Sequence, residues 1–307
     1  MYSILSTLIL LLTLNFCSTS NMASSSVAND SGSSEEMITP LNAEQPVNAF
    51  FNEDKADIGK IEAVLKKVKD IDNINDRIIA ITQEFVGTPY IGGTLNLPSE
   101  ETLYVNTTGV DCTTFVETVI ALALASEQPN PDVNAFLRKL KSIRYRNGEI
   151  DGYPSRLHYI SEWAIDNEKR GNFSEITNQC NLSEPRVKTI DYMTKNRSLY
   201  SALANDTVFE AIKENEKQLK NLHHSIIPTS LVNKAANNFL KNGDIVSIVT
   251  NKPGLDVSHV GIINIKNGIP HMIHASSKYK KVINDTVSLE EYLQKQKSPG
   301  IRVFRLK

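Results

Sequence analysis

The chain has 307 residues, of which 40% are hydrophobic and 22% are charged, a composition that is ordinary for a globular protein with one sizeable core. Its formal net charge is -2. This balance excludes nucleic acid as the main partner, because such binding depends largely on Lys and Arg side chains that neutralise phosphates.

The first 20 residues have the pattern of a signal peptide. An apolar run from Ile4 to Phe16 is too short to span a bilayer comfortably, and small residues follow it in Cys17–Ser20. The alternative is an anchor helix that stays in place, but a Ser-rich stretch follows directly, without a stop-transfer charge cluster. We therefore expect an exported protein of the periplasm or cell envelope. Cys17 stands where lipoproteins carry their lipid-modified cysteine, so a lipid anchor at Cys17 is an open alternative.

Residues 21–48 are rich in Ser, Asn, Ala and Glu and lack apolar periodicity, which predicts a flexible tether. Residues 49–307 are expected to form a single domain. Apolar stripes at helical spacing predict helices at 53–86 (two helices), 112–126, 133–144 and 198–222. Short runs rich in Ile and Val predict strands at 244–249, 259–265, 270–275, 281–283 and 301–304. Helices followed by a mostly antiparallel sheet are typical of an α+β fold.

Cys112 is the candidate nucleophile. It follows Asp111, an acidic capping residue, at the first turn of the 112–126 helix, whose apolar side chains predict that the helix is buried. We expect the positive end of the helix dipole and the free backbone N–H groups to lower the pKa of this thiol from about 8.5 towards neutrality. One alternative is a structural cysteine, which a mid-helix position would favour. The other is a disulfide with Cys180, against which the local context of Cys112 argues.

Three of the six histidines are candidates for the base that a thiol nucleophile needs. His223 and His224 are expected on the surface at a polar helix end. His158 lies in an aromatic stretch that suits substrate contact better than proton transfer. The remaining candidates are His259, His271 and His274.

The dipeptide Asn267–Gly268 decides between these three, because it is the strongest short signal for a two-residue hairpin turn. In that register His274 faces Gly261 across the two strands. His259 lies two residues from Gly261 and points to the same face, so His259 and His274 are diagonal neighbours. His271 points to the other face. The hairpin thus selects His259 and His274.

We expect Cys112 to attack an amide carbonyl, His259 to move the thiol proton to the leaving amine, and His274 to orient and polarise His259. The backbone N–H of Cys112 stabilises the oxyanion, and water hydrolyses the thioester. The rival chemistry, a zinc amidase, needs about three ligands on one side of the site. His271 and His274 point oppositely and no His-Glu-x-x-His motif occurs, so we expect neither a metal nor another cofactor.

Five segments occur in a recognisable order over residues 80–305; they are 87–90 (GTPY) with Gly92–Gly93, Asp111–Cys112, 242–246 (NGDIV), 258–262 (SHVGI) and 273–275 (IHA). Together they resemble the NlpC-type cell-wall cysteine amidases, papain-like α+β enzymes with a Cys-His-polar triad. The resemblance implies that Cys112 begins a buried helix packed on an antiparallel sheet, with helical insertions. It also implies that Tyr90 reaches into the active site beside Cys112 and that His274 fills the third position of the triad.

Four runs, 87–95, 111–117, 152–159 and 254–259, are more similar still to the N-acetylmuramoyl-L-alanine amidase-like branch. Its members cut between muramic acid and the first L-Ala of the stem peptide. The resemblance therefore implies peptidoglycan fragments (muropeptides, 1,6-anhydro forms among them) as substrate. Long connections on both sides of the Cys112 helix depart from the commoner branch, which cuts between D-Glu and the diamino acid. Long loops over a fixed core usually carry substrate specificity.

An aromatic and basic stretch suits a sugar substrate. Aromatic faces stack on pyranose rings, and Arg pairs with a carboxylate through two hydrogen bonds. The alternative is a packed aromatic corner with the arginine in a salt bridge; the resemblance favours substrate contact. The candidate substrate residues are Arg156, His158, Tyr159 and Trp163.

Three other functions stay open. An endopeptidase that cuts between D-Glu and the diamino acid would use the same triad, and an acyltransferase would pass the thioester to an amine. A peptidoglycan-binding lipoprotein without catalysis is the third, although such a module is expected to have lost at least one of Cys112, His259 and His274. The sequence has no coiled-coil signal and leaves the oligomeric state open.

Overall fold

The computed structural model describes residues 47–96 and 100–306, which belong to one compact unit. The predicted signal peptide (1–20) and the tether (21–48) up to residue 46 lie outside the described residues, so both stay predictions. Within the described ranges, no helix combines the length and the apolar character needed to cross a membrane.

Helices dominate the first half of the described unit and strands the second. The α-helices are α1 (Asp54–Val68), α2 (Ile74–Gln83), α3 (Cys112–Ala125), α4 (Val133–Arg144), α5 (Ile160–Lys169), α6 (Tyr192–Lys195), α7 (Asp206–Lys217), α8 (Val232–Ala236) and α9 (Leu289–Lys295). The strands are β1 (Phe50–Phe51), β2 (Tyr104–Val105), β3 (Ser174–Glu175), β4 (Glu184–Lys188), β5 (Leu222–Pro228), β6 (Ile245–Val249), β7 (Val257–Lys266), β8 (Ile269–Ser276), β9 (Lys281–Asn284) and β10 (Gly300–Arg305).

One antiparallel sheet forms the centre of the unit. Its strands lie in the order β4-β5-β10-β6-β7-β8-β9, and β3 pairs with β10. The run β6 to β9 is a meander in which each strand pairs with the next, so the ends of β7 and β8 that carry the candidate histidines lie next to each other. A separate parallel pair joins β1 and β2.

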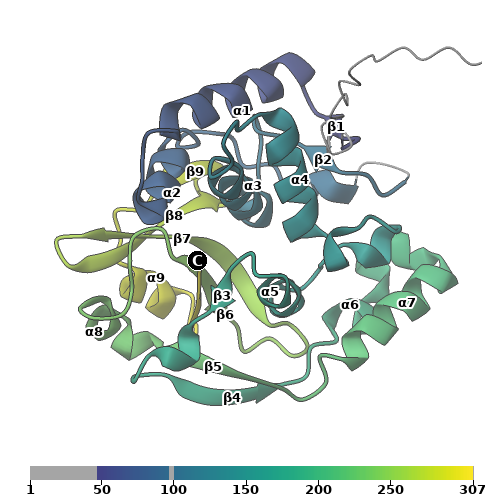
Figure 1. Cartoon of the computed structure of the whole chain (residues 1–307). Helices are drawn as coiled ribbons and strands as arrows, with labels where there is room; N and C mark the ends of the chain where they lie inside the picture. The colour runs from purple at the N-terminus through teal and green to yellow at the C-terminus, as the bar shows by residue number, and fades with distance from the viewer. Residues whose placement is uncertain (1–46, 97–99, 307) are drawn as a thin grey trace, which may run out of the picture. The chain divides into compact units, whose positions relative to one another are not determined.

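Buried apolar side chains cover both faces of the sheet. Successive residues of a strand point to opposite faces. Accordingly, Ile262 and Ile273 join the apolar cluster of α1–α4, whereas Ile263 and Met272 pack in the cluster that includes α8 and α9. Figure 1 shows α1, α2, α3 and α4 gathered on one side of the sheet. The structure confirms a mixed fold in which helices pack on an antiparallel sheet.

Polar side chains cap the starts of three helices that pack on this side of the sheet. The side chains of Asn73, Asp111 and Asp132 accept hydrogen bonds from the first backbone N–H groups of α2, α3 and α4. The predicted helices at 53–86, 112–126 and 133–144 are confirmed, with ends that differ by a few residues at most.

The predicted hairpin is confirmed in register. Lys266 pairs with Ile269 and Asn264 pairs with His271, as a two-residue turn at Asn267–Gly268 requires. Asn267 (φ 52°) and Gly268 (φ 78°) both adopt the left-handed conformation of that turn.

The predicted helix at 198–222 is confirmed only for Asp206–Lys217 (α7); short 3-10 helices precede it, and the predicted C-terminal end is wrong. Helix α7 ends at Lys217, and β5 begins at Leu222, so His223 and His224 lie on a strand rather than at a helix end. Strand β5 pairs with the exposed edge strand β4, and both carry polar side chains at this point. Tertiary pairing, not an apolar pattern in the sequence, thus determines this strand.

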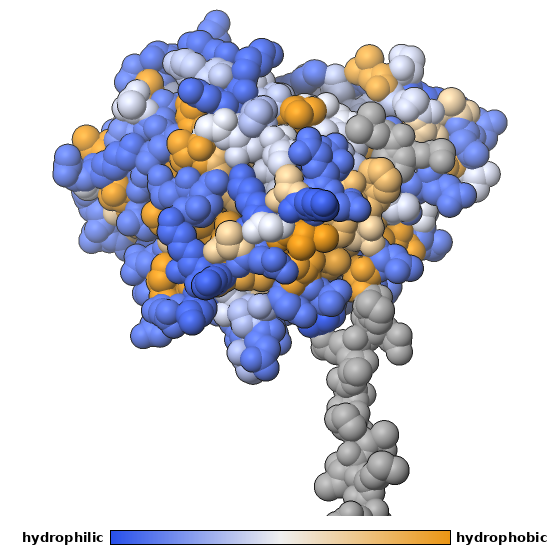
Figure 2. All heavy atoms as spheres, turned by 90° about the horizontal axis from the view of Figure 1, so that it is seen from above, coloured by the Kyte–Doolittle hydropathy of each residue, from blue (hydrophilic) through white to orange (hydrophobic). Residues whose placement is uncertain are grey.

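The surface is mixed. Figure 2 shows hydrophilic atoms over much of one face, with apolar atoms gathered in smaller patches between them. The large exposed apolar side chains come from separate parts of the chain, for example Phe50, Ile165, Leu199 and Ile269. Scattered apolar side chains of this kind are normal for a protein surface.

Candidate active site

Cys112 is the first residue of α3 and is held there by a capping box. The Asp111 carboxylate accepts a hydrogen bond from the backbone N–H of Thr114 (2.8 Å), and the Thr114 hydroxyl accepts one from the N–H of Asp111 (2.9 Å). The side chains of α3 from Thr114 to Ala125 are buried. The packed helix therefore fixes the position of the half-buried Cys112.

The expectation that the helix start lowers the pKa of Cys112 is wrong. Burial, and then the negative charge of Asp111, raise the pKa of this thiol to about 11, while hydrogen bonds from the backbone N–H of Val260 and from Thr113 act in the opposite direction. The same carboxylate that caps the helix thus offsets the helix dipole. A thiol with this pKa is protonated at neutral pH and needs a base to remove its proton.

His259 and His274 meet as the hairpin predicts. Nε2 of His259 lies 2.6 Å from Nδ1 of His274, and the two rings are nearly perpendicular, with centroids 4.8 Å apart. The β7–β8 pairing runs from Lys266 to Ile262, so it stops before it reaches the two histidines. Beyond that point, the backbone N–H of Val260 bonds to the sulfur of Cys112. The end of this pairing brings the thiol and the imidazole pair to one place.

The protonation state of His259 suits a base. Burial and then the nearby His274 lower the pKa of His259 to about 3. The imidazole is therefore neutral at physiological pH and has a lone pair available to accept a proton.

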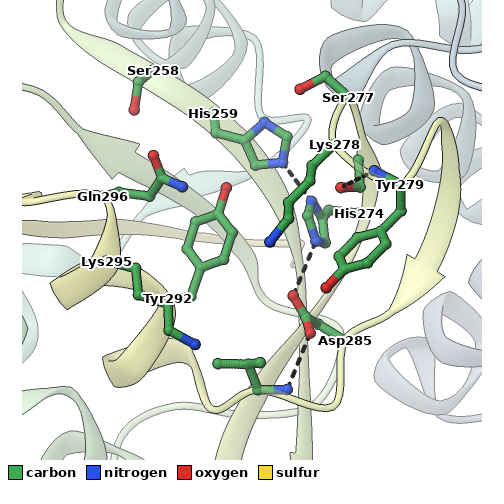
Figure 3. A pocket seen from close by; sticks show the side chains of 12 residues that line it. Ser258, His259, His274, Ser277, Lys278, Tyr279, Asp285, Tyr292, Lys295 and Gln296 are labelled. Carbon is green, nitrogen blue, oxygen red and sulfur yellow. Dashed lines mark hydrogen bonds and ion pairs between the residues drawn. The ribbon is translucent and has the colours of Figure 1, made fainter.

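The carboxylate of Asp285 extends this pair and was missed by the sequence reasoning. Its Oδ2 lies 3.4 Å from Nε2 of His274 (Figure 3). Burial alone would raise the pKa of Asp285, but His274 and the backbone N–H groups of Val287 and Thr286 outweigh burial and lower this pKa.

A signal for Asp285 was present in the sequence. Strand β9 was predicted at 281–283, and the observed register pairs His274 with Ile283. Asp285 lies two residues beyond Ile283 and so reaches the same side of the sheet as His274. Finding Asp285 from the sequence also needs the register of the β8–β9 hairpin, which its turn residues do not signal strongly.

One cavity of about 130 Å³ unites the candidate nucleophile and base. Its lining includes Cys112, His259, His158, Trp163 and Asp256. Leu157, Ile160, Leu255 and Val257 make the rest of the wall largely apolar.

Asp256 fixes one wall of this cavity. Its Oδ2 accepts a hydrogen bond from the backbone N–H of Ser161 (2.7 Å), in the first turn of α5, and its Oδ1 accepts one from the N–H of Val257 (2.8 Å). Both carboxylate oxygens are thus used by backbone groups. This caps α5 and ties it to the loop that precedes His259.

Three of the predicted substrate residues lie close to Cys112. The pKa of Tyr90 is raised by burial and then by Cys112 and Asp111, which places its phenol within electrostatic reach of the thiol. His158 and Trp163 line the cavity. Burial, and then the positive charge of Arg156, lower the pKa of His158 to about 3, so this histidine is also neutral.

The structure does not bring Arg156 and Tyr159 into the cavity. The Arg156 guanidinium donates to the backbone carbonyl of Leu95 (2.6 Å) and to Oδ1 of Asn96 (3.0 Å), and the residue is 5% exposed. The Tyr159 hydroxyl donates to Glu216 (2.6 Å) and is likewise buried. Both side chains serve the packed corner that the sequence left open as the alternative.

A second, larger cavity of about 280 Å³ is also lined by His259. His274, Asp285 and Tyr292 form its inner wall. Figure 3 shows the Lys278 side chain extending in among these side chains. Ser258 and His259 line both cavities, so the candidate base His259 lies at their junction.

Cys112 and Cys180 are both free thiols. Across the described residues, no group of three or more His, Cys, Asp or Glu side chains is arranged to hold a metal ion.

The fold is that of a peptidoglycan amidase-like protein. The chain belongs to the AmiA-like family of N-acetylmuramoyl-L-alanine amidase-like proteins, whose profile matches residues 80–301. No curated protein matches the chain.

Solved structures from three bacteria resemble the chain over most of their length. An N-acetylmuramoyl-L-alanine amidase from Bacteroides uniformis is 35% identical with a TM-score of 0.71, and the match covers 76% of this chain and 99% of that one. A Bacteroides fragilis protein described as a candidate xylanase is 38% identical with a TM-score of 0.70, covering 74% and 99%. A Legionella pneumophila protein is 25% identical with a TM-score of 0.62, covering 82% and 95%.

Proposed function

We propose that the protein is a papain-like cysteine amidase that hydrolyses the amide between N-acetylmuramic acid and L-Ala in peptidoglycan fragments. The observation that carries this proposal is one cavity lined by a thiol at a helix start, Cys112, and by a neutral imidazole, His259. The family and the Bacteroides uniformis amidase supply the class of bond.

In the resting protein the Cys112 thiol and the His259 imidazole are both uncharged, and this determines the first step of the reaction. The Cys112 sulfur attacks the amide carbonyl while His259 takes the thiol proton, because the high pKa of Cys112 leaves little thiolate. The S–C bond forms, and the carbonyl oxygen becomes an oxyanion beside the backbone N–H of Cys112.

The second half of the reaction returns the proton and the enzyme. The C–N bond breaks as the leaving amine of L-Ala takes the proton from His259, and a thioester remains on Cys112. His259 then removes a proton from water, which attacks the thioester carbonyl. The S–C bond breaks, the sulfur is reprotonated, and the muramic acid carboxylate is released.

The two cavities suit the two halves of such a substrate. The cavity beside Cys112 has an indole, an imidazole and aliphatic side chains, which suit a sugar ring with its acyl groups. The second cavity has Lys278 and Lys295 at its rim, and stem peptides carry carboxylates. We therefore place the glycan beside Trp163 and the leaving peptide beside Lys278.

A xylanase function, suggested by the name of the Bacteroides fragilis protein, has less support. Glycoside hydrolysis ordinarily uses two carboxyl groups that flank the scissile bond. The cavity beside Cys112 has one carboxylate, Asp256, and both of its oxygens already accept hydrogen bonds from backbone N–H groups.

The identity of the cleaved bond is tested with defined muropeptides. The purified protein is incubated with disaccharide peptides, in reducing and 1,6-anhydro forms, and the products are identified by mass spectrometry. The proposal predicts an intact disaccharide and a stem peptide that begins with a free L-Ala amine. Fragments cut after D-Glu would instead identify an endopeptidase that uses the same residues. Transfer of the acyl group to an added amine, rather than to water, would identify an acyltransferase.

Export is part of the proposal and is tested separately. The apolar run and the small residues before Ser20 support cleavage of a signal peptide, and Cys17 allows a lipid anchor. The mass of the mature protein from the envelope fraction distinguishes the forms. A lipid-modified N-terminal Cys17 supports the anchor, a later N-terminus supports free export, and a full-length cytoplasmic protein contradicts both.

A further inference from the structure

We propose that Asp285 is a positioning residue that fixes the tautomers of both histidines, so that Nδ1 of His259 is the atom that accepts the Cys112 proton. The inference rests on the proposed function in one respect only, the assignment of His259 as the base. The arrangement of protons itself follows from the contacts between His259, His274 and Asp285.

Nε2 of His274 is buried, and among the described residues it has no well-formed hydrogen bond. Oδ2 of Asp285 lies 3.4 Å from this nitrogen. A carboxylate accepts hydrogen bonds and donates none. An N–H at Nε2 faces an acceptor there, whereas a lone pair would face a negative charge. His274 therefore carries its proton on Nε2.

At a pH where both imidazoles are neutral, each ring has one N–H and one lone pair. With its proton on Nε2, His274 presents a lone pair at Nδ1. Nε2 of His259, 2.6 Å away, must therefore donate its N–H. This leaves Nδ1 of His259 without a proton. Figure 3 shows that this second ring nitrogen points away from His274.

Two hydrogen bonds orient Asp285. Its Oδ1 accepts a hydrogen bond from the backbone N–H of Val287 (3.0 Å), and its own backbone N–H donates to the carbonyl of Met272 (2.9 Å). The backbone bond fixes the position of Asp285, and the bond from Val287 orients its carboxylate. Oδ1 then faces a donor, and Oδ2 faces Nε2 of His274. This arrangement also determines what an amide would do in the same place.

Asp285→Asn is the decisive variant. When the amide oxygen keeps the hydrogen bond from the N–H of Val287, the NH2 group faces Nε2 of His274. Nε2 must then accept, His274 donates from Nδ1, and His259 accepts at Nε2. The proton of His259 then lies on Nδ1, so this atom cannot accept the proton of Cys112. We expect kcat/KM to fall by about 10³ to 10⁴, the size of effect that a wrong histidine tautomer has in a serine protease triad.

Asp285→Ala is the matched variant. Alanine removes the group that favours a proton on Nε2 of His274, but it does not favour a proton on Nδ1 instead. A fraction of molecules therefore keeps the active tautomers. We expect a loss of about 10- to 100-fold, smaller than that of Asp285→Asn. A merely structural role for Asp285 predicts the reverse order, because asparagine keeps the shape of the side chain and alanine does not. A loss with alanine that equals or exceeds the loss with asparagine overturns the inference.

A second readout needs no substrate. In protein labelled with ¹⁵N-histidine, the nitrogen shifts and N–H couplings report which ring nitrogen carries the proton. We expect Nε2–H on His259 and His274 in the native protein and Nδ1–H on both in Asp285→Asn, with His271, on the other face of the sheet, unchanged. Identical tautomers in the two proteins overturn the inference. Because the resting protein is measured, a tautomer switch in a protein that cleaves no muropeptide would sustain the inference and sink the proposed function.

Discussion

Nε2 of His259 and Nδ1 of His274 lie 2.6 Å apart, just beyond the last residues through which β7 and β8 pair. The contact depends on how closely the two strands approach at Gly261, which together with Val260 separates His259 from the segment of β7 that pairs with β8. A Cβ added to Gly261 would lie 2.5 Å from Cγ of Met272 and 3.0 Å from the carbonyl oxygen of Ile273. The absence of a side chain at this position sets the spacing of the histidine pair.

Gly261→Ala tests this dependence. The new methyl group must push β7 away from β8, so we expect kcat/KM to fall at least about tenfold and the free energy of unfolding to fall by about 1–3 kcal/mol. Kinetics and urea unfolding measure the two effects. The control is Gly59→Ala in α1, where nothing lies within 4 Å of the added Cβ; it should leave activity unchanged and stabilise by up to about 1 kcal/mol. A Gly261→Ala variant with native kcat/KM and native stability would show that strand spacing does not set the contact between His259 and His274.

The acid limb of the pH profile tests the protonation state of His259. Burial and His274 lower the pKa of this histidine from its usual 6.5 to about 3, so it stays neutral as the pH falls through 6 and 5. We expect kcat/KM at pH 5 to stay within about threefold of its value at pH 7.5. An unperturbed histidine would lose about 30-fold over the same range. A limb centred near pH 6.5 would contradict the structure, provided that circular dichroism shows a folded protein at pH 5.

The lowered pKa values of His259 and His158 also predict how the free energy of unfolding changes with pH. The unfolded chain binds protons at His259 and His158 with ordinary pKa values, whereas the folded chain binds them only near pH 3. The folded state is therefore fully favoured above pH 6.5 and loses stability as the pH falls from 6.5 towards 3. Thermal unfolding at pH 7.5, 6 and 5 should give a falling midpoint. In His158→Gln the fall should be smaller; an equal fall would locate the effect elsewhere.

Alkylation of Cys112 tests the raised pKa of the thiol. With a pKa of about 11, the thiolate fraction rises about tenfold per pH unit between pH 8 and 10, and so should the rate of reaction with iodoacetamide. Peptide mapping distinguishes Cys112 from the buried Cys180, which should stay unmodified in the folded protein. A rate that is already maximal at pH 7.5 would show a resting thiolate–imidazolium pair and contradict the uncharged pair described here.

A buried ion pair joins α3 to α4. Nε of Arg144 lies 2.7 Å from Oε2 of Glu117, and both side chains are at most 3% exposed. Arg144→Ala leaves Glu117 buried without its partner, so we expect the free energy of unfolding to fall by about 3–5 kcal/mol. Lys141→Ala, which breaks the exposed pair with Glu149, should cost at most about 1 kcal/mol. Equal effects in urea unfolding would argue against a critical buried pair.

The sequence predicts the part of the site that local rules govern. The turn at Asn267–Gly268 determines the register of one hairpin, and that register brings His259 to His274. The acidic residue before Cys112 marks the start of α3, because a capping side chain acts on its own helix. In both cases, residues within about fifteen positions of one another determine the geometry.

The rest of the site depends on contacts between distant segments. Asp285 reaches His274 through a second hairpin that lacks a strong turn signal, and Arg156 is engaged by Leu95 and Asn96, some sixty residues earlier in the chain. The pKa of Cys112 depends on burial, which no local pattern reveals. The polar strand β5 likewise forms because β4 and β10 pair with it.

The central claim is that Cys112 is the nucleophile, and Cys112→Ala tests it most directly. Turnover of a disaccharide-peptide muropeptide is compared between this variant and the native protein, each with and without EDTA, and substrate binding is measured by calorimetry. We predict that the variant binds the muropeptide, that its turnover falls by at least about 10³-fold, and that EDTA leaves the native rate unchanged. Turnover by Cys112→Ala within about tenfold of the native rate would contradict the account.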